Sequence, residues 1–356
     1  DERPTIAGRL TFETLDLTEY YGDQGFEDLM EQDAKLAEPG TEDWIFPETP
    51  LPFELLSEAD ITDFKVEIAN LQVDPDVVIT DISSILSLKD SALHLSELRG
   101  RIYDGDVTGD FKAFQGAAAP AIHLKLKGVN LDYGVFLKAF DITERLRGRM
   151  DIQLDLDGHG TSLRAIASGL DGRIDFNARE GQIDREMLGL LAFGAGSILG
   201  PLVGKDDKGK LECIVTSFTF EDGLGDTLVQ YYETSFFAMA GDGKIDLKTE
   251  TLDFLYHPKA QETSLMKLAT PFRVSGSLQS PDVKVDAGGT LLAAAKTAGT
   301  IASFINPLIG LGVLAGEAVM KDRNGCETAN LVQRGEIPVA DPDPESNPFL
   351  RKKDRN

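Results

Sequence analysis

Side chains that most enzymes use for proton transfer or metal binding are scarce in this chain. Its 356 residues include only four histidines and two cysteines. Cys213 and Cys326 form neither a Cys-x-x-Cys redox pair nor a metal-binding spacing. The sequence also lacks a Walker motif, a Gly-x-Ser-x-Gly elbow and a dinucleotide-binding fingerprint. We therefore expect no catalytic residues, no metal centre and no cofactor, and we predict that the protein is not an enzyme.

The histidines do not form a catalytic pattern. His94 and His123 occupy polar positions of alternating segments, which is typical of solvated strand residues. His159 lies in a Gly-x-Gly turn, but this turn lacks the third glycine and the basic residue of a phosphate-binding loop. His257 has no obvious nucleophile or carboxylate partner in the sequence. The many carboxylates fall at every second position of predicted strands, which favours a solvated face over a paired acid and base.

Positive charge is also limited. The chain has 35 lysines and arginines against 60 aspartates and glutamates, so its net charge is −25. Such a chain would repel nucleic acid and anionic membrane surfaces at long range, and we exclude nucleic-acid binding. No Asp-x-Asp-x-Asp-Gly loop indicates a calcium site. We interpret the acidity as the property that keeps a large solvated surface soluble.

Uninterrupted apolar stretches are few. The chain opens without the apolar core of a signal peptide, so we expect it to be part of a longer protein. Residues 187–203 contain no charged side chain, and residues 288–320 contain only Lys296 and Glu317. The Asn306-Pro307 break divides the second stretch into two helices of about fourteen residues, each ~21 Å long and too short for a ~30 Å bilayer core. We predict a C-terminal apolar helical hairpin whose main contacts come from Leu291, Leu292, Ile301, Phe304, Ile305, Leu308, Leu311 and Leu314.

Alternation of apolar and polar residues is the dominant pattern. In residues 150–157 every apolar side chain is followed by a polar one, and residues 122–127 and 174–176 repeat this pattern. Successive side chains of a strand point to opposite faces, so the sequence predicts an antiparallel sheet with one apolar face. Asp151, Asp155 and Asp175 are expected to face water. The apolar face is predicted to line a lipid groove with Ile122, Leu124, Leu126, Met150, Ile152, Leu154, Leu156, Ile174 and Phe176.

Helical spacing is rare and lies between predicted strands. Residues 132–140 and 162–170 show it, and Thr161 or Ser162 would be the N-cap of the second helix. The fold class that follows is mainly β with a few short helices.

Several segments in combination resemble the C-terminal region of the AsmA family. They are LDGHGTSLR at 156–164, LDGRIDF at 170–176, GDGKIDL at 241–247 and PFRVSGSLQSPDV at 271–283. The resemblance covers residues 145–335. The preceding residues share the strand pattern of this region, but less distinctively.

The resemblance implies a long, twisted antiparallel β-groove, shaped like a taco, in a periplasmic protein. It also implies an anchor in the bacterial inner membrane, formed by an N-terminal helix that this chain lacks, and a role in phospholipid movement. The spacing of Cys213 and Cys326 alone leaves a disulfide and two free thiols equally open. The resemblance implies the disulfide.

We divide the chain into a groove segment at 1–144, with an acidic and proline-rich insertion around 22–52, an AsmA-like region at 145–335 and a disordered tail at 336–356. The predicted function is a periplasmic groove that binds or transfers lipid and supports phospholipid movement between the inner and outer membranes and outer-membrane homeostasis. The partners would be phospholipid or another acyl-chain lipid, the inner membrane and the outer membrane. The alternative is a non-catalytic scaffold that recruits outer-membrane proteins.

Overall fold

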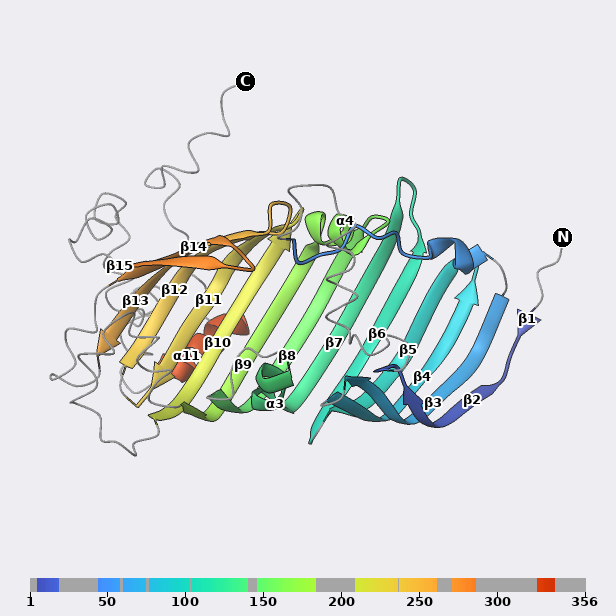
Figure 1. Ribbon diagram of the computed structural model, residues 1–356, viewed down its shortest axis with the longest axis horizontal. Coiled ribbons are helices and arrows are strands. Elements are labelled where there is room, and N and C mark those ends of the chain that lie inside the picture. The colour runs from blue at the N-terminus through green and yellow to red at the C-terminus, as the bar shows by residue number, and fades with distance from the viewer. Residues whose placement is uncertain are drawn as a thin grey trace, which may run out of the picture. The chain divides into compact units, whose positions relative to one another are not determined.

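The computed structural model describes residues 5–18, 44–57, 60–74, 77–102, 104–139, 146–183, 209–235, 237–260, 271–285 and 325–336. These residues form one large mixed β-sheet with a few short helices (Figure 1). From β3 to β15 each strand is hydrogen-bonded to the next strand in the chain, whereas β1 and β2 both pair with β3. The prediction of a mainly β fold is therefore confirmed.

The strands are β1 Thr5–Ile6, β2 Arg9–Asp16, β3 Asp60–Asp74, β4 Val77–Lys89, β5 Ala92–Ile102, β6 Gly105–Gln115, β7 Pro120–Asp132, β8 Leu146–His159, β9 Asp171–Ile183, β10 Gly209–Glu221, β11 Leu224–Thr234, β12 Phe237–Asp246, β13 Thr251–Ala260, β14 Phe272–Ser277 and β15 Pro281–Val285. The helices are the 3-10 helix η2 Phe53–Ser57 and the α-helices α3 Tyr133–Ala139, α4 Leu163–Ser168 and α11 Gly325–Gln333.

The chain separates into two compact units. Unit 1 comprises residues 1–176 together with 219–226 and 245–251, and unit 2 comprises residues 177–218, 227–244 and 252–356. The two short additions to unit 1 contain the turns that follow β10 and β12. The sequence boundary expected at residue 144 stays a prediction.

The prediction of a purely antiparallel sheet is wrong at its N-terminal strands. Both β1 and β2 run parallel to β3, and in the second pair Leu10 lies opposite Val66. Parallel neighbours need a long connection, which residues 17–59 supply between β2 and β3. The later strands of unit 1 have shorter connections and pair antiparallel from β3 to β8.

Four strands of unit 1 contain a β-bulge at a residue with left-handed φ. These residues are Asp63, Asp81, Glu97 and Asn130, with φ between 50° and 58°, and each lies inside a register shift of its strand. A bulge adds one residue to one strand, so it moves the alternation by one position. On β7 the bulge at Asn130 therefore brings Leu131 opposite Met150.

Both predicted short helices are present. The segment expected at 132–140 forms α3, and the segment expected at 162–170 forms α4. Ser162 is the N-cap of α4, because its hydroxyl accepts a 3.1 Å hydrogen bond from the Ala165 amide. This result selects Ser162 over Thr161.

Other predicted segments fall on residues that the structure does not describe. They include most of the insertion around 22–52, the apolar stretch at 187–203, the terminal hairpin at 288–320 and the tail after residue 336. The hairpin residues from Leu291 to Leu314 therefore stay predictions. Among the helices that are described, none has both the length and the apolar character needed to cross a membrane.

Candidate functional site

Unit 1 carries a row of apolar side chains that crosses six consecutive strands. Residues directly opposite one another in an antiparallel pair lie on the same sheet face. In this row the register places each side chain opposite the next one on the neighbouring strand. We call this set the second row: Phe64, Leu86, Leu95, Phe111, Leu124 and Leu156. Five of these side chains are half-buried, and Leu156 is 9% exposed.

A first row lies two residues away along the strands, or three on β3 because of the bulge at Asp63, and on the same face. Its members are Ile61, Leu88, Leu93, Ala113 and Ile122, and it ends opposite Gly158 of β8. On the other side of the second row, Leu126 lies opposite Leu154 and Ile152 lies opposite Gly128. We call the first row, the second row and these flanking residues the apolar face.

The apolar face includes six of the nine side chains that alternation predicted. β7 contributes Ile122, Leu124 and Leu126, and β8 contributes Ile152, Leu154 and Leu156. Met150 lies next along β8, opposite Leu131. The remaining two, Ile174 and Phe176, are two residues apart on β9 and are half-buried. The register thus brings the predicted side chains of β7 and β8 together, while their role in lipid binding stays a prediction.

The opposite sheet face of unit 1 is polar. Lys125 lies across from Asp155, with 3.4 Å between the ammonium and carboxylate groups. Asp155 is exposed, as predicted. Asp151 and Asp175 are half-buried, and Asp151 accepts a 2.9 Å hydrogen bond from the Asn130 amide. Charged groups therefore alternate with apolar groups across the thickness of the sheet.

The histidines predicted to be solvated strand residues have carboxylate partners. His94 Nε2 lies 2.7 Å from Asp110, and His123 Nδ1 lies 2.8 Å from Asp157. Each pair joins two neighbouring strands of unit 1, β5 with β6 and β7 with β8, on the polar face. The partners lie 16 and 34 residues away along the chain, so strand alternation alone did not indicate them.

Two short helices cover the first row. Leu56 of η2 is 8% exposed and packs against Leu88 and Ala113, and Phe53 packs against the same cluster. At the end of the row Ile166 of α4 is 4% exposed and lies over Gly158. A Cβ on Gly158 would lie 2.6 Å from Ile166 Cγ2, so the close approach of α4 requires glycine.

The chain before η2 passes along α4. The Leu51 amide donates a 2.7 Å hydrogen bond to the Thr161 carbonyl, and Pro50 forms an isolated bridge with Ser162. The Arg164 amide donates a 3.1 Å hydrogen bond to the Pro47 carbonyl. We call residues 44–57 the cover segment, because they include both this stretch and η2.

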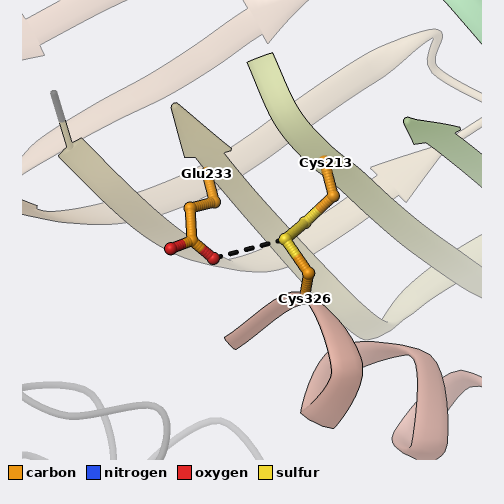
Figure 2. Close-up of side chains that lie close together, drawn as sticks. All are labelled: Cys213, Glu233 and Cys326. Atoms are coloured by element: carbon orange, nitrogen blue, oxygen red, sulfur yellow. Dashed lines mark hydrogen bonds between the residues drawn. A yellow bond between two sulfur atoms is a disulfide. The ribbon is translucent and has the colours of Figure 1, made fainter. Parts of the chain in front are cut away.

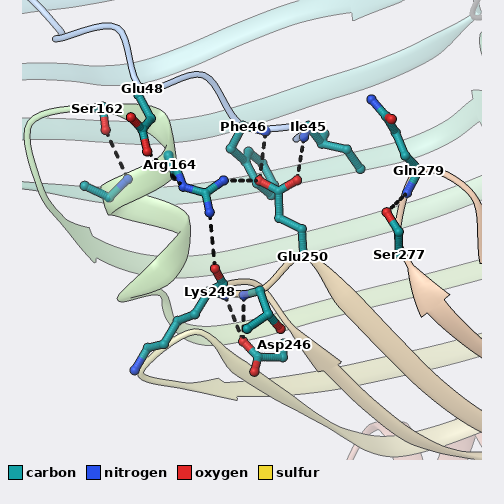
Figure 3. Close-up of polar contacts among 12 residues, drawn as sticks. Ile45, Phe46, Glu48, Ser162, Arg164, Asp246, Lys248, Glu250, Ser277 and Gln279 are labelled. Carbon is teal, nitrogen blue, oxygen red and sulfur yellow. Dashed lines mark hydrogen bonds and ion pairs between the residues drawn. The ribbon is translucent and has the colours of Figure 1, made fainter. Parts of the chain in front are cut away.

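A buried ion pair holds the beginning of the cover segment (Figure 3). The side chains of Arg164 and Glu250 are 8% and 3% exposed, and Nη1 of the arginine lies 3.1 Å from Oε1 of the carboxylate. Glu250 also accepts hydrogen bonds from the Ile45 and Phe46 amides, at 2.5 and 3.1 Å. Arg164 lies over the Trp44 ring. One carboxylate thus joins the cover segment to α4.

Arg164 makes two further contacts. Its Nε lies 3.3 Å from the Glu48 carboxylate, and its Nη2 lies 3.4 Å from the Lys248 carbonyl (Figure 3). Sequence reasoning missed this network. Its central residues, Arg164 and Glu250, are 86 residues apart, so the segment LDGHGTSLR, which ends at Arg164, did not indicate Glu250 as a partner.

The other end of the apolar face lies near α3. Leu131 is 3% exposed and Tyr133 is 4% exposed. The Tyr133 hydroxyl donates a 2.8 Å hydrogen bond to the Arg147 carbonyl. Burial, and to a smaller extent the charge of Asp132, raises the pKa of Tyr133 well above its usual value. The half-buried middle of the apolar face therefore lies between two covered ends.

Unit 2 contains the disulfide that the AsmA resemblance implied (Figure 2). Cys213 of β10 bonds to Cys326 of α11, with 6.0 Å between their Cα atoms. The buried residues Cys213, Val215, Tyr231 and Ala329 pack together between α11 and the strands. The Gln333 side chain adds a 3.1 Å hydrogen bond to the Thr216 carbonyl. The disulfide prediction is confirmed.

A carboxylate lies next to this disulfide. Glu233 Oε2 is 3.2 Å from Cys326 Sγ and accepts a 3.1 Å hydrogen bond from the Tyr231 hydroxyl (Figure 2). The two sulfurs and the carboxylate are close enough to serve as metal ligands. However, the sulfurs are bonded to each other and therefore are not thiolate ligands in this state. Burial, followed by the charge of Glu233, raises the pKa of Tyr231 above its usual value.

Unit 2 also holds an aromatic cluster that sequence reasoning missed. It consists of Phe218, Tyr232, Phe254, Tyr256 and Phe272, with neighbouring ring centroids 5.0 to 6.1 Å apart. Glycines of β12 make room for it, since a Cβ on Gly241 would lie 2.5 Å from the Tyr256 ring. Alternation indicates which strand side chains are apolar but does not indicate which rings meet across strands.

Comparison with known proteins identifies the family. The sequence profile of the AsmA family matches residues 1–224, which is more than half of the chain. The chain belongs to the AsmA family. The match includes the N-terminal half, where the resemblance was less distinctive, and overlaps the region 145–335 only as far as residue 224. Membership of the AsmA family indicates a function related to the cell envelope.

Two relatives from Escherichia coli K12 are similar to the chain. The AsmA family protein YhjG is 24% identical over 258 residues, which cover 70% of this chain and 36% of that protein. Protein AsmA is 22% identical over 178 residues, which cover 49% of this chain and 29% of that protein. The chain thus spans roughly a third of the length of these relatives. No solved structure matches the chain.

Proposed function

We propose that the apolar face of unit 1 binds the acyl chains of phospholipids or related lipids, and that the protein takes part in lipid transfer. In this proposal the protein acts without catalysis in the periplasm and supports phospholipid movement between the inner and outer membranes and outer-membrane homeostasis. The observation that carries the proposal is the second row, which crosses six strands in register and leaves five apolar side chains half-buried.

The dimensions of the second row suit an acyl chain. Six strands at a spacing of about 4.8 Å give a row about 24 Å long. One acyl chain spans about 15 Å, since it fills half of a ~30 Å hydrocarbon core. Each methylene that leaves water contributes about 0.8 kcal/mol, so a sixteen-carbon chain could gain on the order of 12 kcal/mol if it were fully covered.

The distribution of charge also supports this function. Lys125 and Asp155 pair on the polar face, and His123 and Asp157 pair there as well. A lipid on the apolar face would therefore meet few charges from β7 and β8. The head group would remain in water at the edge of this face, where its polar atoms need no buried partner.

Membership of the AsmA family supports a location in the cell envelope. Lipid exchange between two membranes would require a contact with each of them. We propose that a membrane helix anchors the full-length protein in the inner membrane, and that the protein also meets the outer membrane.

Photo-crosslinking tests the proposal directly. A photoreactive amino acid replaces Leu154 on the apolar face or its neighbour Asp155 on the polar face, in protein made in the bacterial periplasm. We expect phospholipid adducts, identified by mass spectrometry, at position 154 and not at position 155. Leu126 and Lys125 form a second matched pair, because they lie opposite these residues on β7.

Equal labelling at both positions, or none at either, would contradict the proposal. The alternative scaffold function predicts a different result. In that case position 154 would crosslink to an outer-membrane protein, and native mass spectrometry of the purified chain would show no bound phospholipid.

A further inference from the structure

The first row of the apolar face is covered by another part of the same chain, the cover segment. Phe53 and Leu56 of the cover segment pack on Leu88 and Ala113, and Ile122 packs against the same cluster. Among the described side chains of the adjacent second row, Phe111 alone packs against the cluster that contains Leu56. The main difference between the two rows is therefore that the cover segment lies on the first row.

The attachment of the cover segment is slight compared with that of a strand. Leu56 is its one buried side chain among those described, and residues 48–50 are exposed. Its contact with the α4 region includes a single isolated bridge, from Pro50 to Ser162, and no ladder. Pro47, Pro50 and Pro52 lack amide donors, so the segment cannot pair continuously as a strand. The segment could therefore leave the face without breaking the sheet.

The two ends of the cover segment are held by different forces. At one end the Glu250 carboxylate accepts the Ile45 and Phe46 amides and pairs with buried Arg164. At the other end Leu56 and Phe53 make apolar contacts. An acyl chain competes with apolar contacts and leaves the polar end unaffected. The polar end can thus retain the segment while the apolar end is displaced.

We propose that residues 44–57 are a displaceable cover, and that an acyl chain competes with Phe53 and Leu56 for the first row. This inference rests on the proposed lipid-binding function. When the cover leaves, the first row joins the second, so the accessible apolar face becomes wider. The cover thus regulates how much apolar surface a lipid can reach.

Hydrogen exchange on the unmodified full chain tests the displacement. The probe is palmitate, added below the concentration at which it forms micelles. We expect the Leu51 amide, which is bonded to the Thr161 carbonyl, to exchange faster with palmitate than without it. The Gly160 amide, bonded to the Pro120 carbonyl beside α4, should show no change.

Variants test the competition. Leu56→Ala removes the buried anchor, which shifts the equilibrium toward the open state. The apparent dissociation constant is inversely proportional to the open fraction, so palmitate should bind about tenfold more tightly or better. Leu224→Ala is the matched control, because Leu224 is 38% exposed and lies outside the cover and the apolar face. It should bind palmitate as the unmodified chain does.

A locked cover provides the opposite variant. Pro50→Cys with Ser162→Cys places two cysteines at the isolated bridge, where the backbones are close enough for a disulfide. The locked protein should bind palmitate more weakly than the Ser162→Cys single variant, which controls for loss of the helix cap. This measurement is independent of the stability of Leu56→Ala.

The outcomes separate the two proposals. If palmitate binds and neither the Leu51 amide nor the variants respond, the cover is fixed and the inference is overturned. If palmitate binds to none of the proteins, the proposed lipid-binding function itself fails. Faster exchange at Leu51 together with opposite shifts in the two variants supports both.

Discussion

Units 1 and 2 each place a short helix on an apolar sheet surface, but they retain it by different means. In unit 2 the Cys213–Cys326 disulfide joins α11 to β10 covalently. In unit 1 the cover segment is held by hydrogen bonds to the α4 region and to Glu250, which pairs with buried Arg164, and by a few apolar contacts. A covalent link fixes its helix permanently under oxidising conditions, whereas noncovalent contacts allow exchange with a ligand. This difference fits a helix α11 that stays attached in unit 2 and the displaceable cover segment proposed for unit 1.

Removing the disulfide should have the largest effect. The bond closes a loop with a sequence separation of 113 residues, so Cys213→Ser with Cys326→Ser should lower the unfolding free energy by about 4–5 kcal/mol in the chain-entropy model. Urea unfolding followed by circular dichroism measures this loss. The single tryptophan, Trp44, lies in unit 1, so its fluorescence should report a smaller shift. Equal shifts by both probes would mean that the two units unfold together and would undermine the comparison.

Breaking the buried ion pair should have the next largest effect. Glu250→Gln leaves the Arg164 guanidinium, 8% exposed, without its buried carboxylate partner. Removal of one partner of a buried pair costs about 3 kcal/mol or more. The exposed Glu48 carboxylate, 3.3 Å from Arg164 Nε, compensates the remaining charge only in part. Urea unfolding monitored by Trp44 fluorescence should show the loss.

A double variant sharpens this test. Arg164→Met together with Glu250→Gln removes the charge as well as its partner, so part of the lost stability should return. If the double variant is as unstable as the sum of the two single variants, the ion pair does not hold the cover segment as described.

The smallest effect concerns the rate at which the disulfide is reduced. A thiolate that attacks the disulfide must approach the Glu233 carboxylate, which lies 3.2 Å from Cys326 Sγ. The same negative charge disfavours Cys326 as a departing thiolate. Glu233→Gln should therefore be reduced several-fold faster by dithiothreitol, as measured by alkylation and mass spectrometry. Glu212→Gln, whose carboxylate pairs with Lys210, is the control and should react at the original rate.

Local pattern was sufficient to predict many of the strands and both short helices. Residues 150–157 alternate strictly and lie within β8, and Ser162 caps α4 as a serine before a helical pattern should. The apolar side chains of β7 and β8 could be predicted because alternation depends only on neighbours in the chain. Antiparallel pairing then brought Leu124 opposite Leu156.

The cover segment could not be predicted in the same way. Its anchor Glu250 accepts a hydrogen bond from the Ile45 amide, which is 205 residues away, and a lone glutamate in a polar turn carries no signal of that contact. The parallel pairing of β2 was missed because residues 9–16 carry no mark of strand direction. The bulge at Glu97 was missed because glutamate rarely adopts left-handed φ.

The cover segment bonds to Glu250, which lies far from it in the sequence, and this has a consequence for the order of folding. Strands β3 to β8 pair as successive neighbours, and such local contacts close early. The bonds from Ile45 and Phe46 to Glu250 close over 200 residues, so they form only after the turn that follows β12 has been synthesised and placed. In a pulse-labelling experiment the Ile45 amide should gain protection after the amides of β5 to β7. The nascent protein therefore passes through a stage in which both rows are uncovered, and a lipid or a chaperone could bind before the chain covers itself.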